Sequence, residues 1–195
     1  LDFMRRIDLS KERIFEKKKK SNKNIRKNQS KFYWAVEIPS NNHDLMTYEK
    51  IQDKNVLEIG CSNGYSATKY SKYYSTYLGI DISDKAINKA KMLELKNTEF
   101  ICTDAHLLPI DNNIFDCVIV NSLLHHLDLK KSLGEINRVL KRGGYLIFRE
   151  PLGTNLFFQI YRKLTPSVRT SDENPFNFND IKLIKSYFHF ENVQY

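Results

Sequence analysis

Apolar residues between Asn55 and Glu150 recur in two alternating patterns. Short, mostly apolar runs typical of buried strands alternate with segments whose apolar residues recur at helical spacing. The predicted strands are 56–59, 77–80, 99–102, 115–120 and 145–148, and the predicted helices are 65–73, 83–95, 129–140 and 180–188. Strands that alternate with helices at this pitch form βαβ units with right-handed crossovers. The pattern therefore predicts an α/β fold: a Rossmann-like, doubly wound and mostly parallel sheet with helices on both faces.

The ends of the predicted elements carry local signals. Ser83 is an N-cap candidate for the second helix, and Gly143-Gly144 is expected to end the third. After Pro151 the alternation stops: an apolar stripe covers 156–164, and a new strand is expected to begin near Phe190. We therefore expect either that the protein continues beyond residue 195, so that the C-terminal strands are truncated in this sequence, or that the sheet is shortened.

Composition fits one domain with buried thiols. A chain of 195 residues with 41% hydrophobic content can bury one core. Cys61, Cys102 and Cys117 lie in or beside apolar runs without metal-ligand spacing, which predicts free buried thiols in a reducing compartment and no metal site. The sequence shows no signal-peptide pattern and no apolar stretch of about 18 residues, so we expect a cytoplasmic protein.

The positive charge is confined to the N-terminal arm. Residues 1–31 hold 12 Lys/Arg and 4 Asp/Glu, which accounts for the whole net charge of +8. A nucleic-acid footprint would spread basic residues over a face of the fold, so a nucleic-acid partner is disfavoured. The arm alone can contact phosphates or an anionic membrane surface, or remain a solvated helix.

A glycine-containing turn follows the first predicted strand. Gly60 and Gly64 in Glu58-Ile-Gly60-Cys-Ser-Asn-Gly64 would let a ligand approach the backbone. Asp81 ends the next strand, 21 residues after Gly60, where a carboxylate can accept both ribose hydroxyls. These two features predict a nucleoside at the carboxyl edge of the sheet, and they fit a nicotinamide cofactor as well.

Asp104 separates these alternatives. It ends the third predicted strand, before Ala105, where a carboxylate can accept from an adenine amino group. The turn lacks the Gly-x-Gly-x-x-Gly pattern that binds a pyrophosphate, and no Gly-Lys-Ser/Thr of a P-loop follows it. The sequence thus disfavours a dinucleotide or a nucleoside triphosphate.

Taken in order, these and later segments resemble the motifs of class I S-adenosylmethionine (SAM)-dependent methyltransferases. The resemblance runs from about residue 54 to 151 and is nearest to the ubiquinone/menaquinone C-methyltransferase subgroup, also called methyltransferase type 11. The segments are Val56–Gly64, Gly79–Asp81, Cys102–Ala105, Leu108–Asp111, Phe115–Val120, His125-His126 and Glu135–Gly144. Family loops often carry glycine where this chain has Ser62.

The resemblance implies a seven-stranded sheet with a final antiparallel strand, SAM as methyl donor and S-adenosylhomocysteine (SAH) as product. It implies that Glu58 and the Gly60 loop hold the methionine end of SAM, and that Asn121 lies where cofactor and substrate meet. The cofactor-binding residues expected on this basis are Glu58, Gly60, Cys61, Ser62, Gly64, Asp81, Ile82, Asp104, Ala105 and Asn121. The expected domains are the basic arm, 1–31, and a methyltransferase domain, 32–195, of which 151–195 forms a cap on the acceptor side.

The sequence specifies the methyl acceptor less well than it specifies the cofactor. An oxygen or nitrogen acceptor can need a base, and His125 or His126 follows the fourth predicted strand; alternatively, the pair bonds backbone and caps the next helix. His125, Glu150 and Tyr161 are candidates for substrate contact, although the aromatic stripe around Tyr161 also fits core or lid packing. The predicted acceptor is a small-molecule or lipid-linked compound that undergoes O- or C-methylation.

Two alternatives come from other functional classes. An RNA methyltransferase could use the basic arm as a guide, but Asn121-Ser-Leu-Leu differs from the Asn-Pro-Pro-Tyr type used by base-amino methyltransferases. A non-catalytic binding partner could keep the SAM fold, but Gly60, Gly64, Asp81 and Asp104 are all intact.

Overall fold

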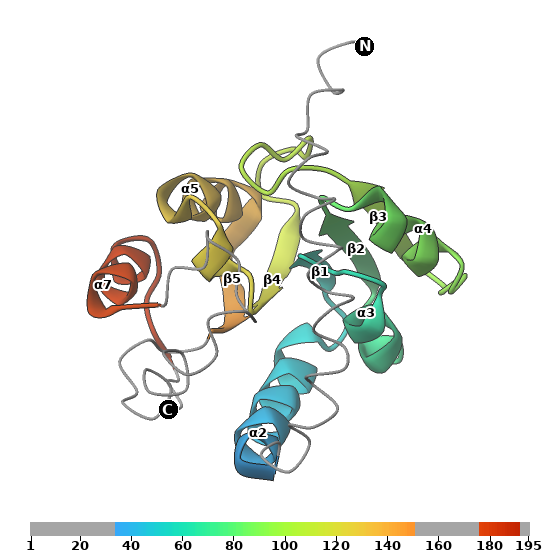
Figure 1. Ribbon diagram of the computed structural model, residues 1–195, viewed down its shortest axis with the longest axis horizontal. Helices are drawn as coiled ribbons and strands as arrows, with labels where there is room; N and C mark the ends of the chain where they lie inside the picture. The colour runs from blue at the N-terminus through green and yellow to red at the C-terminus, as the bar shows by residue number, and fades with distance from the viewer. Residues whose placement is uncertain (1–33, 151–175, 192–195) are drawn as a thin grey trace, which may run out of the picture.

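A five-stranded parallel sheet forms the centre of the protein. The computed structural model describes residues 34–150 and 176–191. The strand order is β3-β2-β1-β4-β5, and all four pairings are parallel (Figure 1). The strands are β1 (Asn55–Ile59), β2 (Thr76–Asp81), β3 (Thr98–Cys102), β4 (Phe115–Asn121) and β5 (Leu140–Arg149). The predicted α/β fold is confirmed: the order reverses between β1 and β4, where such sheets bind ligands at their carboxyl edge.

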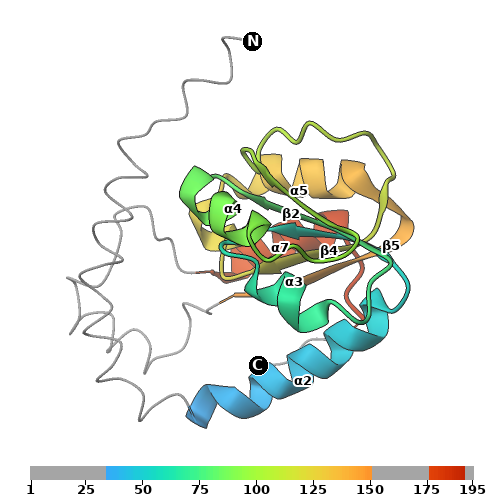
Figure 2. The ribbon, with the colours of Figure 1, turned by 90° about the vertical axis from the view of Figure 1, so that its right-hand side faces the viewer.

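Helices cover both faces of this sheet. The cores show that α2, α3 and α4 pack on one face, while α5 and α7 pack on the other (Figure 2). The helices are α2 (Trp34–Ile51), α3 (Tyr65–Tyr70), α4 (Asp84–Lys91), α5 (Leu129–Val139) and α7 (Phe178–Tyr187), with a 3₁₀ turn, η3 (Leu124–His126), after β4. None of the helices in the described ranges is long and apolar enough to cross a membrane.

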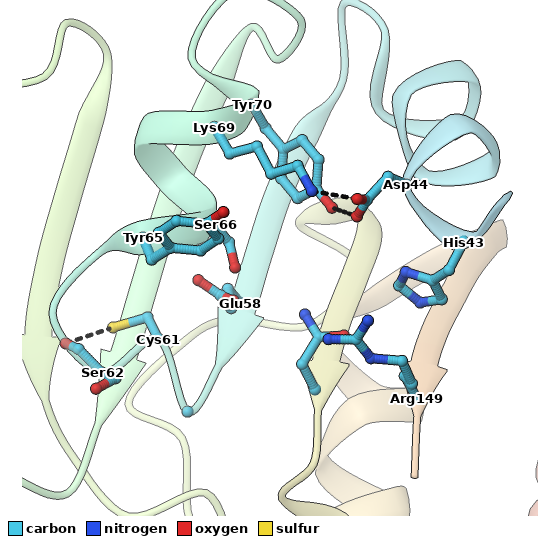
Figure 3. A pocket seen from close by; sticks show the side chains of 12 residues that line it. His43, Asp44, Glu58, Cys61, Ser62, Tyr65, Ser66, Lys69, Tyr70 and Arg149 are labelled. Carbon is cyan, nitrogen blue, oxygen red and sulfur yellow. Dashed lines mark hydrogen bonds and ion pairs between the residues drawn. The ribbon is translucent and has the colours of Figure 1, made fainter. Parts of the chain in front are cut away.

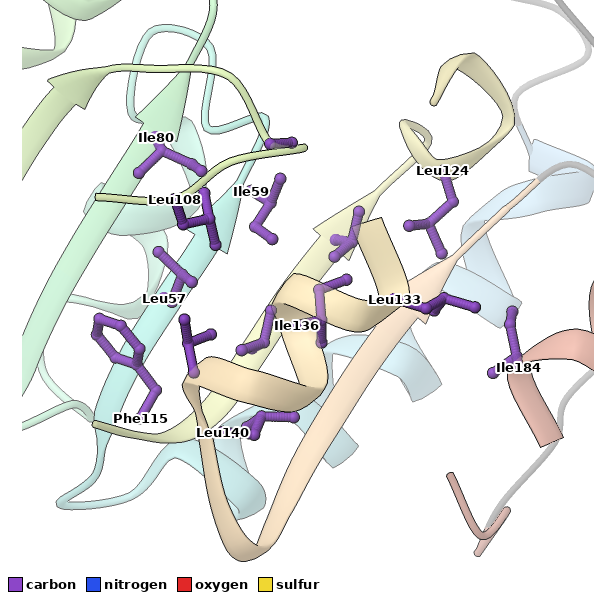
Figure 4. Packing of buried hydrophobic residues seen from close by; sticks show 14 of the residues in the cluster. Leu57, Ile59, Ile80, Leu108, Phe115, Leu124, Leu133, Ile136, Leu140 and Ile184 are labelled. Carbon is purple, nitrogen blue, oxygen red and sulfur yellow. The ribbon is translucent and has the colours of Figure 1, made fainter. Parts of the chain in front are cut away.

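Alternating side chains on β4 belong to two separate hydrophobic cores, one on each face of the sheet. Val118 and Val120 pack with α5 and α7, whereas Cys117 and Ile119 pack with α2, α3 and α4. Figure 4 shows the first of these cores, with Leu133 and Ile136 of α5 and Ile184 of α7. Both faces are apolar because parallel strands with helices on each side have no solvent face. Each such side chain contributes about 1.5–3 kcal/mol when fully buried, so the two cores fix the strand ends in place.

The predicted buried thiols are confirmed at two positions. Cys61 and Cys117 are buried, Cys102 is partly exposed, and none of the three is part of a disulfide among the described residues. Burial raises the pKa of the Cys117 thiol to about 12 and that of the Cys61 thiol still further above its usual range. Neither thiol is a thiolate nucleophile near neutral pH.

Helix starts agree with the sequence better than helix ends. The Ser83 Oγ accepts a hydrogen bond from the Ala86 N–H, so the predicted N-cap of α4 is confirmed. α4 nevertheless ends at Lys91 rather than Leu95, and Glu94, inside the predicted helix, adopts a positive φ angle of 49° that is incompatible with a helix. The prediction that Gly143-Gly144 ends α5 is wrong: the chain passes from Val139 directly into β5, and both glycines lie inside that strand.

Three further expectations from the sequence differ from the structure or concern residues outside the described ranges. The helix α2 was not predicted, because polar residues dominate it and its apolar residues form no stripe. Residues 188–191 form no strand, contrary to the expectation for 190–195, of which 192–195 lie outside the described residues. The apolar stripe 156–164, including Tyr161, also lies outside them, and the described ranges contain five strands rather than seven.

Candidate functional site

The candidate residues meet at one edge of the sheet. Because the strands are parallel, their carboxyl ends lie together. In the order of the strands across the sheet, this edge carries Asp104 after β3, Asp81 on β2, Glu58 on β1, Asn121 on β4 and Arg149 on β5. The fold therefore brings together polar groups from across 92 residues of sequence.

The turn after β1 needs glycine for its own geometry. Gly60 and Gly64 have φ angles of 79° and 78°, in the left-handed region. A Cβ would lie 2.7 Å from Leu123 Cδ2 at Gly60 and 2.7 Å from Leu93 Cδ1 at Gly64. The structure thus explains these glycines by backbone conformation and by packing against leucines. Ser62, where the family often has glycine, also has a positive φ of 50°.

The Asp81 side chain connects the turn after β1 to the turn after β2. Its Oδ2 accepts from the Ser62 N–H at 2.8 Å, and its Oδ1 accepts from the Ser83 N–H at 2.9 Å. A carboxylate has about four lone-pair sites, so both oxygens can still accept from a ligand. Asp81 is therefore suited to hold the loop and ribose hydroxyls at once.

Asp104 belongs to a network that reaches α5. Its Oδ1 accepts from the His106 N–H at 2.9 Å and lies 2.6 Å from His106 Nδ1. His106 Nε2 accepts from the Asp128 N–H at 3.0 Å, so Nδ1 carries the proton and donates to Asp104. The Asp104 side chain is 47% exposed, Ala105 is buried beside it, and Ile82 is half-exposed nearby along the chain.

A pocket of about 460 Å³ lies between α2, α3 and the ends of β1, β4 and β5 (Figure 3). It brings together five of the predicted cofactor residues and leaves the other five outside it, along the same edge. It is lined by His43, Asp44, Glu58, Gly60, Cys61, Ser62, Tyr65, Ser66, Lys69, Tyr70, Asn121 and Arg149.

Glu58 is a buried carboxyl in this pocket. Only 3% of the residue is exposed, and Tyr77 donates to its Oε2 at 2.6 Å. Burial raises the pKa of Glu58 to about 7, although hydrogen bonds from the side chains of Ser66, Tyr77 and Asn121 lower it. A carboxyl poised this close to neutrality favours a cationic ligand group, which would stabilise its charged form.

Two buried polar atoms of the pocket have no hydrogen-bond partner among the described residues. They are Asn121 Oδ1 and His43 Nε2. Leaving such an atom unpaired costs about 1–3 kcal/mol, so both atoms are expected to bind a ligand or water. Asn121 Oδ1 and the Glu58 carboxylate supply two hydrogen-bond acceptors in one pocket, which suits the ammonium group of a ligand.

The helix α2 is joined to α3 beside the pocket. Tyr70 donates from its hydroxyl to Asp44 Oδ1 at 3.0 Å, and Lys69 pairs with Asp44 Oδ2 (Figure 3). On the same helix, burial lowers the pKa of His43, and the charge of Arg149 lowers it further. Sequence reasoning missed His43 and Asp44, because α2 lies before the recognised motifs. It also missed Lys69 on α3 and Arg149 on β5, because no sequence spacing links these positions to the pocket.

His125 and Glu150 form a buried pair instead of lining the pocket. Glu150 Oε1 accepts from the N–H groups of Leu123 and Leu124, and its Oε2 lies 2.5 Å from His125 Nδ1. The two side chains are only 6% and 2% exposed, and the His126 ring packs on His125 with centroids 4.0 Å apart. Glu150 thus holds the turn after β4, which corresponds to the structural alternative weighed for the histidine pair.

Comparison with known proteins identifies the central segment. Residues 57–148 match the family described as "Methyltransferase domain". The chain is 30% identical over 112 residues to the fatty-acid O-methyltransferase of Mycolicibacterium smegmatis, a match that covers 55% of this chain and 41% of that one. It is 32% identical over 136 residues to the malonyl-[acyl-carrier protein] O-methyltransferase of Buchnera aphidicola, covering 66% and 52%.

A solved structure has the same fold. The SAM-dependent methyltransferase of Methanosarcina mazei superposes with a TM-score of 0.60 at 24% identity, over 72% of this chain and 82% of that one. The sequence matches span about half or less of the length of the relatives. Together, these findings support a class I SAM-dependent methyltransferase domain with SAM as its cofactor, on the Rossmann-like methyltransferase fold.

Proposed function

We propose that this protein is a SAM-dependent methyltransferase that methylates an oxygen or carbon atom of a small-molecule or lipid-linked acceptor. The observation that carries the proposal is the pair of acceptors in the pocket, Glu58 and the unpartnered Asn121 Oδ1. The carboxylates on the next two strand ends, Asp81 and Asp104, extend this site along the sheet edge. An ammonium group, a ribose and an adenine in that order match SAM.

Each residue would hold one part of SAM. Glu58 and Asn121 would accept from its ammonium group, Asp81 from the ribose hydroxyls, and Asp104 with Ala105 would meet the adenine. Bound SAM supplies an electrophilic methyl group on a sulfonium. The protein supplies alignment and a pocket without bulk water, and alignment alone can contribute roughly 7–11 kcal/mol toward the barrier.

The acceptor class rests on the relatives. Both relatives are O-methyltransferases by name, one for fatty acids and one for a malonyl group on acyl carrier protein. Their similarity supports a small-molecule or lipid acceptor for this chain. Membership in the ubiquinone C-methyltransferase subgroup, a role for His125, His126, Glu150 or Tyr161 at the acceptor, and membrane contact by the arm 1–31 of a cytoplasmic protein remain predictions.

Calorimetric titration with SAH tests the cofactor. We expect the wild-type protein to bind SAH and to give no heat with NAD. Glu58→Gln keeps the shape of the side chain but removes its charge, so SAH should bind at least ~10-fold more weakly. Glu99→Gln is the matched control, because Glu99 is exposed on β3 and should leave SAH binding unchanged. Failure of a folded wild-type protein to bind SAH would refute the proposal.

A further inference from the structure

The His106 side chain connects the candidate adenine contact to the start of α5. Asp104 and His106 belong to the segment that follows β3, and Asp128 is the N-cap residue of α5. His106 Nδ1 lies 2.6 Å from Asp104 Oδ1, and the Asp128 N–H donates to His106 Nε2 at 3.0 Å. The imidazole thus lies between a carboxylate at the sheet edge and the first turn of a helix whose apolar side chains are buried in the core.

These two contacts determine which ring nitrogen of His106 carries the proton. A backbone N–H can only donate, so Nε2 must accept and the neutral ring carries its proton on Nδ1. The Nδ1–H group then donates to Asp104, and a hydrogen bond to a carboxylate is among the stronger ones in proteins. The Asp128 N–H therefore fixes the tautomer that His106 presents to Asp104.

His106 occupies one oxygen of Asp104 and leaves the other available. Oδ1 accepts from the His106 N–H at 2.9 Å as well as from Nδ1–H, which uses both of its lone pairs. With Oδ1 held in this way, Oδ2 is the oxygen that can accept from a ligand. An unshared carboxylate oxygen attracts one N–H of an amino group and repels a carbonyl oxygen at the same place.

The backbone on both sides of Asp104 is fixed, whereas its side chain is not. Thr103 and Ala105 are buried, and the Thr103 N–H donates to the Asp81 carbonyl at 3.0 Å. The Asp104 side chain itself is 47% exposed, so without a partner it would lose rotamer freedom on binding a ligand. The imidazole of His106 restricts this freedom in advance, beside the candidate ribose contact Asp81.

We propose that His106 is a positioning residue that orients Asp104 toward the exocyclic amino group of adenine, and thereby makes the site select adenine over hypoxanthine. The proposal rests on the SAM-dependent function argued above and adds a residue that acts only through Asp104. In this arrangement the Asp128 N–H sets the tautomer of His106, His106 holds Oδ1 of Asp104, and Oδ2 accepts from the ligand.

Calorimetry of the full chain with SAH and with S-inosylhomocysteine, in which a carbonyl replaces the adenine amino group, tests the proposal. We expect the wild-type protein to bind SAH at least ~10-fold more tightly than this analogue. His106→Ala keeps the backbone N–H that donates to Asp104 but removes the imidazole. SAH affinity should therefore fall by about 5-fold, while affinity for the analogue stays within about 2-fold of wild type. His189→Ala, at an exposed histidine, is the matched control and should change neither affinity.

Two further variants separate the two contacts of the imidazole. His106→Asn places an amide N–H near the position of Nδ1, so SAH affinity should stay within about 2-fold of wild type. His106→Gln places an amide oxygen near the position of Nε2, where it can accept from the Asp128 N–H without holding Asp104, so this variant should resemble His106→Ala. In the Asp104→Asn background, His106→Ala should weaken SAH binding little further, because the two residues act as one unit.

NMR gives a result that does not depend on affinity. Long-range ¹H–¹⁵N correlations should show the Nδ1–H tautomer of His106 in the unliganded protein. Three results would overturn the proposal: an Nε2–H tautomer, an unchanged SAH affinity in His106→Ala, or equal losses of affinity for SAH and its analogue in that variant. In each case, binding of SAH by the wild-type protein would leave the proposed methyltransferase function standing, whereas a folded wild-type protein that binds no SAH would overturn both.

Discussion

The site has two parts that are built in different ways. The part proposed to hold the nucleoside consists of the turn Gly60–Gly64, Asp81 and Asp104, each placed at or just after the end of a strand by local sequence. The corner of the pocket between α2 and β5 consists of His43 and Arg149, which are 106 residues apart and line the same pocket only because α2 packs near the end of β5. The first part is specified by short motifs and the second by tertiary packing. The class of cofactor can therefore be predicted from the sequence, whereas the methyl acceptor cannot.

Removing Asp81 should have the largest effect on the nucleoside part. Asp81→Ala deletes the proposed acceptor for the ribose hydroxyls and also the two hydrogen bonds that hold Ser62 and Ser83. We expect SAH affinity to fall by about 100-fold or more, and the free energy of unfolding to fall by about 2 kcal/mol. Calorimetry and urea denaturation measure the two quantities. Asp111→Ala, an exposed aspartate, is the control, and an unchanged stability would contradict the loop-anchoring role.

Replacing Glu58 by glutamine should increase the stability of the fold and weaken SAH binding. Its folded pKa of about 7 lies above the unfolded value of 4.5, so ionisation destabilises the unliganded fold as pH rises from about 4.5 through 7. Glu58→Gln removes this cost and should raise the free energy of unfolding at pH 8 by on the order of 1–3 kcal/mol. The gain should shrink toward pH 5, where the wild-type carboxyl is protonated in the folded protein.

The measurement is urea denaturation of both proteins at pH 5 and pH 8, without SAH. A variant less stable than wild type at both pH values would mean that the hydrogen bonds from Tyr77, Ser66 and Asn121 outweigh the cost of burying the charge. Glu99→Gln controls for the loss of one negative charge from the surface.

The same titration should appear in the affinity of the wild-type protein. Glu58 must be ionised to bind an ammonium group, and with a pKa of about 7 it is mostly protonated at pH 6 and mostly ionised at pH 8. SAH should therefore bind about 10-fold more tightly at pH 8 than at pH 6. Calorimetry at both pH values measures this ratio. Glu58→Gln should bind weakly with little dependence on pH, and an equal dependence in the variant would assign the effect to another group.

The sequence predicted the sheet and the strand-end residues because each depends on neighbouring residues. A buried run followed by a glycine or an acid needs no distant partner to be recognised, as at Ile59-Gly60 and Ile80-Asp81. The glycine stop predicted for α5 was wrong because Gly143-Gly144 lies inside β5, where the register with β4 shifts, and local sequence does not distinguish such a strand from a helix end. The role of Glu150 also escaped prediction, since its bonds to Leu123, Leu124 and His125 cross from β5 to β4.

Ser62 offers the smallest and most local test. It is a non-glycine residue at a φ of 50°, between two glycines that share the left-handed region. Ser62→Gly should relieve this strain, which costs about 1–2 kcal/mol for an L-residue, but the added freedom of the unfolded chain offsets about 0.5–1 kcal/mol. The net gain in the free energy of unfolding should be about 0.5 kcal/mol. Because the Ser62 N–H still donates to Asp81, SAH affinity should stay within about 2-fold of wild type.

Urea denaturation measures the effect of Ser62→Gly on stability, and calorimetry measures its effect on SAH binding. A large loss of SAH affinity would show that the Ser62 side chain itself contacts the cofactor, and the turn would then contribute more than its backbone to the nucleoside part of the site.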